Sequence, residues 1–143
     1  MQKRGAAMLI KWTPQYAVGV PEIDQQHQEL FSKVNDLLEA CQRGEGKQEI
    51  GNVLSFLEEY VKIHFGTEEK AMLDNAYPEY EQHRAQHQKF VENFLELKAK
   101  FEAEGAGIWL VAHTNRVVVD WLIKHIMMTD TKLGSFLKSK QGN

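Results

Sequence analysis

Apolar residues recur every three or four positions along most of this chain, which is the period of a helix with one buried face. The pattern predicts long helices at about residues 21–42, 47–73, 78–104 and 108–128, a short C-terminal helix at about 131–139, and an irregular arm over about residues 1–20. Short loops make consecutive helices antiparallel neighbours. We therefore predict an all-α, up-down-up-down four-helix bundle in a single domain spanning residues 1–143.

The predicted buried rows of these helices carry histidines among the apolar residues. The rows are Ile23, His27, Leu30, Val34, Leu37 and Cys41; Ile50, Leu54, Leu57, Val61, His64 and Glu68; Tyr80, His83, His87, Phe90, Phe94, Leu97 and Phe101; and Val111, Thr114, Val118, Trp121, His125 and Met128. Five of the six histidines lie on these rows. The sixth, His113, points about 120° away from His125 and is expected on a flank or at the surface.

The positions of these polar residues along the helices indicate one shared site. His27, His83 and His87 lie near the starts of the first and third helices, whereas His64, Glu68 and His125 lie near the ends of the second and fourth. In an antiparallel bundle these ends meet. Each buried polar group costs about 1–3 kcal/mol if it is left unsatisfied, and a charged group costs more. One core histidine alone is more often a hydrogen-bonded residue than a ligand, but a bound metal ion accounts best for the whole cluster.

Helix geometry selects the carboxylates that can join the histidines. Glu68 lies four residues after His64 and therefore faces the same side, whereas Glu69 points about 140° away and is expected in solvent. Asp130 follows His125 by five residues in "HIMMTD", a spacing that diverges by the same angle on a regular helix. A π-type bulge between them would bring Asp130 to the site. The alternative is that Asp130 caps the short C-terminal helix.

The set of donors suggests which metal would bind. Five imidazoles and two bridging carboxylates would supply nine donor atoms, which exceeds what two tetrahedral zinc ions accept. Two octahedral ions offer more positions, and a bridging oxygen would leave one of them open. Nitrogen-rich donors without thiolate suit iron, cobalt or manganese, and availability favours iron.

Composition narrows the classes of partner. The net charge of −3 and pI of about 6.1 provide no basic surface for nucleic acid or an anionic membrane. The single cysteine, Cys41, excludes an internal disulfide and suits a reducing compartment. The apolar run of the N-terminus is too short for a signal peptide, and no segment is long enough to span a membrane. We expect a cytoplasmic monomer.

The ordered motifs His27, "HFGTE", "HRAQH" and "HIMMTD" resemble the hemerythrin family, as do the flanks in "KWTPQYAVGVPEIDQQHQELF". The resemblance, to its single-domain bacterial members, extends from about Trp12 to Leu137. It implies a non-haem diiron site in which one iron is bound by His83, His87 and His125 and the other by His27 and His64. It further implies that Glu68, Asp130 and an oxo or hydroxo group bridge the irons, and that dioxygen binds at the open position of the second iron.

The resemblance also suggests roles for residues around the site. Leu122 and Trp121 match residues beside bound dioxygen, although each could be a plain core residue. Asp24 could hydrogen-bond to a ligand or cap the first helix, and Trp12 could cover the site with the arm or only anchor the arm.

The leading function is reversible dioxygen binding without catalysis, for transport, storage or delivery to an oxygen-consuming enzyme. The same seven ligands, His27, His64, Glu68, His83, His87, His125 and Asp130, could serve a diiron oxidase or peroxidase, or an oxygen or redox sensor. Four-helix-bundle oxidases usually rely on Glu and Glu-x-x-His ligands, whereas here nitrogen predominates, which favours binding. An iron store is disfavoured because no acidic channel is recognisable.

Overall fold

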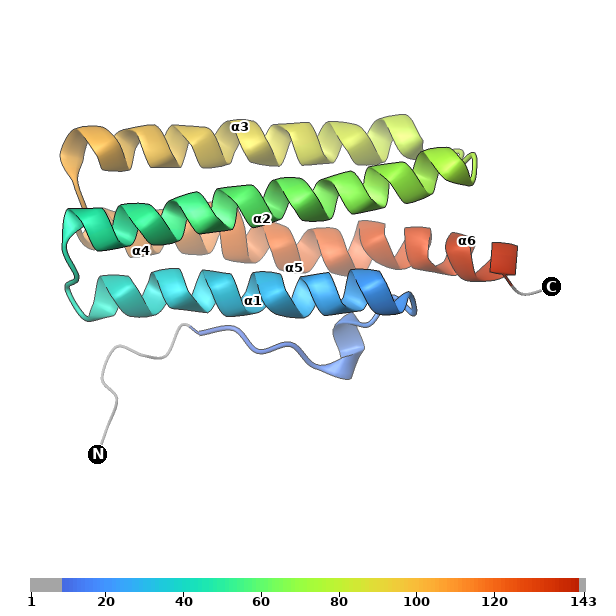
Figure 1. Ribbon diagram of the computed structural model, residues 1–143, viewed down its shortest axis with the longest axis horizontal. Helices are drawn as coiled ribbons and strands as arrows, with labels where there is room; N and C mark the ends of the chain where they lie inside the picture. The colour runs from blue at the N-terminus through green and yellow to red at the C-terminus, as the bar shows by residue number, and fades with distance from the viewer. Residues whose placement is uncertain (1–8, 142–143) are drawn as a thin grey trace.

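The computed structural model describes residues 9–141, which form antiparallel helices packed side by side (Figure 1). The first three are α1 (Pro21–Gln42), α2 (Lys47–Asp74) and α3 (Tyr80–Glu104). The fourth helical run comprises α4 (Ile108–Thr114), the π-helix η3 (Asn115–Asp120), α5 (Trp121–His125), the π-helix η4 (Ile126–Asp130) and α6 (Thr131–Gln141). A 3-10 turn, η2 (Pro14–Tyr16), lies in the N-terminal arm. The predicted all-α four-helix bundle with a C-terminal helix is confirmed.

Local sequence accounts for most of the helix ends. Pro21 opens α1, where its missing N–H removes no intrahelical bond. Gly105 ends α3 with a φ of 77°, which favours a residue without a side chain. The predicted start of this helix at about residue 78 is two residues too early, because Pro78 belongs to a turn and α3 begins at Tyr80. The predicted C-terminal helix is present as α6, which follows η4 directly.

The two π-helices change which residues of the fourth run face the core. A π turn takes one more residue than an α turn, so each π segment rotates the residues that follow it. Ile126, which follows η3, is fully buried although it does not belong to the predicted row. Met128 was predicted on that row but is 62% exposed, so this expectation is wrong. A row counted at regular helical spacing cannot follow the face through such segments.

The N-terminal arm is fastened to the bundle by specific contacts. The side-chain amide of Asn35 on α1 pairs with both the N–H and the carbonyl of Ile10, at 2.9 and 2.7 Å. Trp12 is partly buried against the core hydrophobic residues. Near the other end of the arm, the carbonyl of Val18 lies against the backbone of Gly134 on α6, in a space that a side chain on Gly134 would fill. The arm therefore packs on the first helix and the last.

Replacing Gly134 with alanine tests whether this close approach matters. An added Cβ would lie 2.1 Å from the Val18 carbonyl oxygen, so either the arm or α6 must move. We expect a loss of about 1–3 kcal/mol in the free energy of unfolding and faster proteolysis of the arm. Gly66→Ala on α2 is the matched control, since its Cβ meets nothing within 4 Å, and it is expected to stabilise the protein by about 0.5–1 kcal/mol. Equal stability of the two variants would contradict this account of the arm.

Within residues 9–141, none of the helices is both long enough and apolar enough to cross a membrane.

Candidate metal centre

The predicted ligands come together inside one end of the bundle. Figure 1 shows the start of α1, the end of α2 and the start of α3 at the same end, beside the run from α5 to α6. His27, His64, Glu68, His83, His87, His125 and Asp130 are each at most 4% exposed. Apart from Thr114, these seven are the fully buried polar side chains among the described residues. Helices distant in sequence thus enclose one polar cluster.

The cluster divides into two groups of potential ligands that share both carboxylates. One group consists of His83, His87 and His125 with Glu68 and Asp130. The other consists of His27 and His64 with the same two carboxylates. Within each group the ligand atoms lie within 4.8 Å of one another. Two metal ions could therefore be held side by side.

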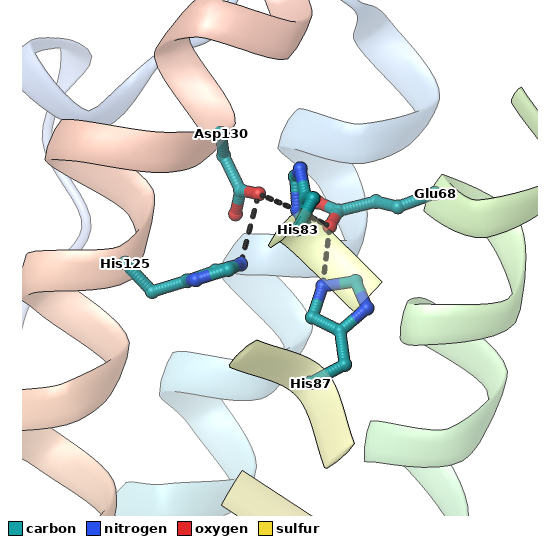
Figure 2. A group of neighbouring side chains, drawn as sticks. All are labelled: Glu68, His83, His87, His125 and Asp130. Atoms are coloured by element: carbon teal, nitrogen blue, oxygen red, sulfur yellow. Dashed lines mark hydrogen bonds and ion pairs between the residues drawn. The ribbon is translucent and has the colours of Figure 1, made fainter. Parts of the chain in front are cut away.

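Each carboxylate turns one oxygen toward each group. Oε1 of Glu68 lies 3.1 Å from Nε2 of both His83 and His87, as Figure 2 shows, whereas Oε2 lies 3.1 Å from Nε2 of His64. Oδ1 of Asp130 lies 3.1 Å from His83 Nε2 and 3.2 Å from His125 Nε2, whereas Oδ2 lies 3.0 Å from His27 Nε2. The same division of oxygens in two independent side chains suits a pair of ions better than one.

Several of these short contacts are not hydrogen bonds, so the atoms involved are available as metal ligands. Both Asp130 oxygens and Nε2 of His27 and of His125 are buried without a hydrogen-bond partner. Adjacent ligands about 2.1–2.2 Å from an octahedral ion are about 3.0 Å apart, whereas tetrahedral ligands are about 3.5 Å apart. Six of the contacts between ligand atoms measure 3.0–3.2 Å, which matches the octahedral spacing, and the contact between His27 Nε2 and Glu68 Oε2 is longer, at 3.5 Å. The donor set therefore fits a non-haem iron site.

The π-helix η4 places Asp130 in this cluster. It spans Ile126–Asp130 and begins directly after His125, so the five-residue separation stays on one face. The predicted π-type bulge is confirmed. Asp130 does not act as a side-chain cap, because α5, η4 and α6 continue through helical backbone at Ile126 and Thr131.

Three histidines have their outer nitrogen, Nδ1, oriented by a side chain on a neighbouring helix. His64 Nδ1 donates to Oε1 of Gln26 at 2.8 Å, and His125 Nδ1 donates to Oε1 of Gln86 at 2.7 Å. His87 Nδ1 donates to Oε2 of Glu69 at 2.8 Å. Bonds of this kind leave the Nε2 lone pair directed at a metal.

These three partners are not among the predicted site residues. Nothing in the sequence separates Gln26 and Gln86 from ordinary surface glutamines. The expectation that Glu69 lies in solvent is only partly met, because its side chain is 27% exposed and its carboxylate bonds to His87 on α3.

The electrostatics of the cluster keep both carboxylates charged. Burial alone would raise the pKa of Glu68, but His64 and His27 hold that pKa well below its usual range. Burial and Glu68 would raise the pKa of Asp130, but the neighbouring histidines lower it. Ionised carboxylates are the form that binds a metal.

The histidines respond in two ways. Burial opposes protonation of His27 and His83, yet the negative charges of the adjacent Asp130 and Glu68 carboxylates raise the pKa of each to about 9. The pKa of His87 is also raised, against burial, by Glu68 and Glu69. Burial prevails at His125 and lowers its pKa. Metal binding at neutral pH must therefore displace protons from this cluster.

Aromatic rings cover two of the histidines in the three-histidine group. Phe65 stacks on His87 with ring centroids 3.8 Å apart, and Trp121 stacks on His125 at 4.3 Å. Trp121 and Leu122 also line a small apolar cavity of about 10 Å³ together with Leu30, Val34, Leu57, Val61, Phe65, Phe90 and Val118. The predicted pocket residues therefore lie on the apolar wall beside the cluster.

The remaining residues singled out in the sequence lie outside the cluster. The Asp24 carboxylate accepts hydrogen bonds from the N–H groups of Val18 and Gly19, so its described hydrogen bonds hold the arm rather than a histidine. His113 is half-buried on the flank and its Nδ1 donates to the Trp109 carbonyl at 3.2 Å. Cys41 is partly buried, which raises the pKa of its thiol.

Comparison with known proteins places the fold and the cluster in one family. Residues 18–137 match the family described as hemerythrin HHE cation binding domain. A bacteriohemerythrin of Methylococcus capsulatus is 35% identical over 132 residues, which are 92% of this chain and 98% of that protein. A hemerythrin-like protein of Naegleria gruberi is 27% identical over 121 residues, covering 85% of this chain and 87% of that protein.

A solved structure described as "Crystal structure of hemerythrin:wild-type" superimposes with a TM-score of 0.82 at 35% sequence identity, covering 90% of this chain and 98% of that chain. The match of fold, sequence and cluster confirms the resemblance seen in the sequence. The chain belongs to the hemerythrin family.

Proposed function

We propose that this protein binds dioxygen reversibly at a pair of iron ions and acts as an oxygen carrier, store or delivery protein rather than an enzyme. The observation that carries the proposal is the division of the carboxylate oxygens of Glu68 and Asp130 between the two histidine groups. His83, His87 and His125 would hold one iron, His27 and His64 the other, and Glu68 and Asp130 would bridge both. When bound in the ferrous state, such a pair can supply the two electrons that reversible dioxygen binding requires.

The number of donors points to where dioxygen would bind. The three-histidine group offers one nitrogen more than the two-histidine group, while both share the same carboxylates. An iron held by His27 and His64 would therefore keep one position free for a small ligand. Leu122 lies on the apolar wall that would keep water from a ligand, and Trp121 covers the three-histidine side by stacking on His125.

The surroundings of the cluster support binding over an oxidase or peroxidase. Substrate oxidation requires groups that deliver protons, and often space for an organic molecule. Among the described residues, the buried side chains with a polar group besides the seven proposed ligands are those of Thr114 and Tyr77, whose hydroxyl groups are weak acids. The enclosed cavity that Leu122 lines, about 10 Å³, has room for no organic substrate, and the larger pockets of about 510 and 330 Å³ beside His87 and His125 are open to the surface. Both features suit a site that holds a diatomic gas without turning it over.

The test is anaerobic reduction of the iron-loaded protein followed by repeated cycles of oxygen addition and removal. We expect two irons per chain and a charge-transfer absorption band that appears with oxygen and disappears when oxygen is removed. Decay of the band within one cycle, with release of hydrogen peroxide or turnover of an added reductant, would assign the site to an oxidase or redox sensor instead. Fewer than two irons would contradict the ligand assignment.

A further inference from the structure

The outer hydrogen bonds of the proposed ligands differ in one respect. His64 and His125 donate to the neutral amide oxygens of Gln26 and Gln86, whereas His87 donates to the carboxylate of Glu69. The three contacts have nearly equal lengths, 2.7–2.8 Å. The acceptors therefore differ in charge rather than in distance.

The position of Glu69 explains how a third carboxylate, besides Glu68 and Asp130, can lie so close to the buried cluster. Its side chain is 27% exposed, and it lines an open pocket of about 510 Å³ between α2 and α3. Lys62 lines the same pocket, but its ammonium group pairs with Glu58 at 3.0 Å. Contact with solvent keeps the desolvation cost of the Glu69 charge low. The hydrogen bond to His87 couples this charge to the proposed ligand atom, Nε2, on the other side of the ring.

An ionised acceptor changes the ligand to which it bonds. It draws the Nδ1 proton of the imidazole toward itself and makes Nε2 a more basic donor. A more basic donor favours ferric over ferrous iron, so the reduction potential falls. Phe65, stacked on His87 at 3.8 Å, covers one face of the imidazole ring. Because His87 is buried, water screens the interaction of its ring with the Glu69 charge only weakly.

We propose that Glu69 is a positioning residue that makes the iron of the three-histidine group the more readily oxidised of the pair. The inference rests on the proposed iron occupancy of the cluster, but not on reversible oxygen binding. The charge of Glu69, acting through its hydrogen bond to His87, would lower the reduction potential of that iron relative to the other.

The chain itself supplies matched variants. Glu69→Gln keeps the shape and the acceptor oxygen but removes the charge, so all three outer acceptors become amides. Gln86→Glu makes the reverse change on another ligand of the same iron, at a site where Thr129 also donates to Gln86 at 3.0 Å. Glu92→Gln removes a carboxylate from the wall of the same pocket without a described hydrogen bond to a ligand, and it serves as the control.

The measurement is an anaerobic redox titration of each iron-loaded variant, with iron counted per chain. We expect Glu69→Gln to raise the midpoint potential of one iron, Gln86→Glu to lower it, and Glu92→Gln to leave it unchanged. A tenfold change in the ratio of ferric to ferrous affinity corresponds to about 59 mV for a one-electron couple. Chelator competition should show about 10-fold weaker binding of ferric iron in Glu69→Gln, with unchanged circular dichroism.

The outcomes separate this inference from the proposed function. Reversible oxygen binding with equal potentials in wild type and Glu69→Gln would overturn the inference alone. Shifted potentials in a protein that binds oxygen irreversibly would support the inference and overturn the proposed function. If Glu69→Gln retains no iron, Gln86→Glu decides, since a potential that does not fall would overturn the inference. A wild-type chain that binds no redox-active iron would overturn both.

Discussion

Replacing Glu68 with alanine is expected to weaken the binding of both metal ions, whereas replacing His64 with alanine should weaken only one. Glu68 is a member of both groups of ligands, and His64 is a member of the two-histidine group alone. Loss of a charged direct ligand should exceed the 10–100-fold loss in affinity typical of an outer hydrogen-bond partner. We therefore expect more than about 100-fold weaker binding at both positions in Glu68→Ala.

Metal analysis after dialysis against a chelator measures the difference. The wild type should retain two irons per chain, His64→Ala about one, and Glu68→Ala fewer than one. Glu59→Ala, which removes an exposed carboxylate from the same helix, should behave as the wild type. Equal losses in Glu68→Ala and His64→Ala would mean that the two groups do not bind their ions separately.

The sequence predicts the fold of this protein well because its helices are amphipathic and its loops short. The predicted bounds of α1, residues 21–42, agree with the structure at both ends. The unusual element η4 could also be predicted, because the five-residue separation of His125 and Asp130 is compatible with one site only if the helix widens. Spacing is informative wherever two residues must reach the same place.

The prediction fails where no such requirement is visible in the sequence. η3 precedes His125 and contains none of the proposed ligands, so nothing in "NRVVVD" marks its widened turn. Regular spacing also places Met128 on the buried row, but Met128 lies inside the widened turn of η4 and is exposed. A register change that serves packing alone is not marked by the chemistry of the residues involved.

Contacts between helices are the other part that sequence could not provide. Glu69 points away from Glu68 on its own helix, and only the position of α3 shows that its side chain reaches His87. Gln26 on α1 reaches His64 on α2, and Gln86 on α3 reaches His125 on α5, in the same way. The proposed ligands follow from one-dimensional spacing, whereas their supports depend on neighbouring helices.

Removal of the metal is expected to lower stability by an amount that grows as the pH rises from about 6.5 to about 9. In the metal-free protein, the pKa of His27 and of His83 is raised from 6.5 to about 9 by Asp130 and Glu68, against burial. The stability that these protonated histidines contribute is complete below about pH 6.5 and is lost as the pH rises through 9. His125, whose pKa is lowered by burial, is neutral in the folded chain over this window and has no stabilising proton to lose.

The lowered pKa values of Glu68 and Asp130 act at the opposite end of the pH range. Their contribution is present above the ordinary carboxyl values of 4.5 and 3.8 and is lost as the pH falls through the lowered values. The metal-free protein should therefore be most stable between about pH 4.5 and about pH 6.5.

In the loaded protein the histidines are neutral ligands, so no stabilising proton remains to be lost above pH 6.5. An ion present at about 1,000 times its dissociation constant adds about 4 kcal/mol, or on the order of 10 °C in Tm for a chain of this size. Thermal unfolding of metal-free and ferrous protein, compared at about pH 6.5 and about pH 9 under anaerobic conditions, measures the difference. The gap in Tm should be wider at the higher pH, because only the metal-free protein loses stability between the two values. A gap that narrows would show that the histidine cluster is not held by Glu68 and Asp130 in the absence of metal.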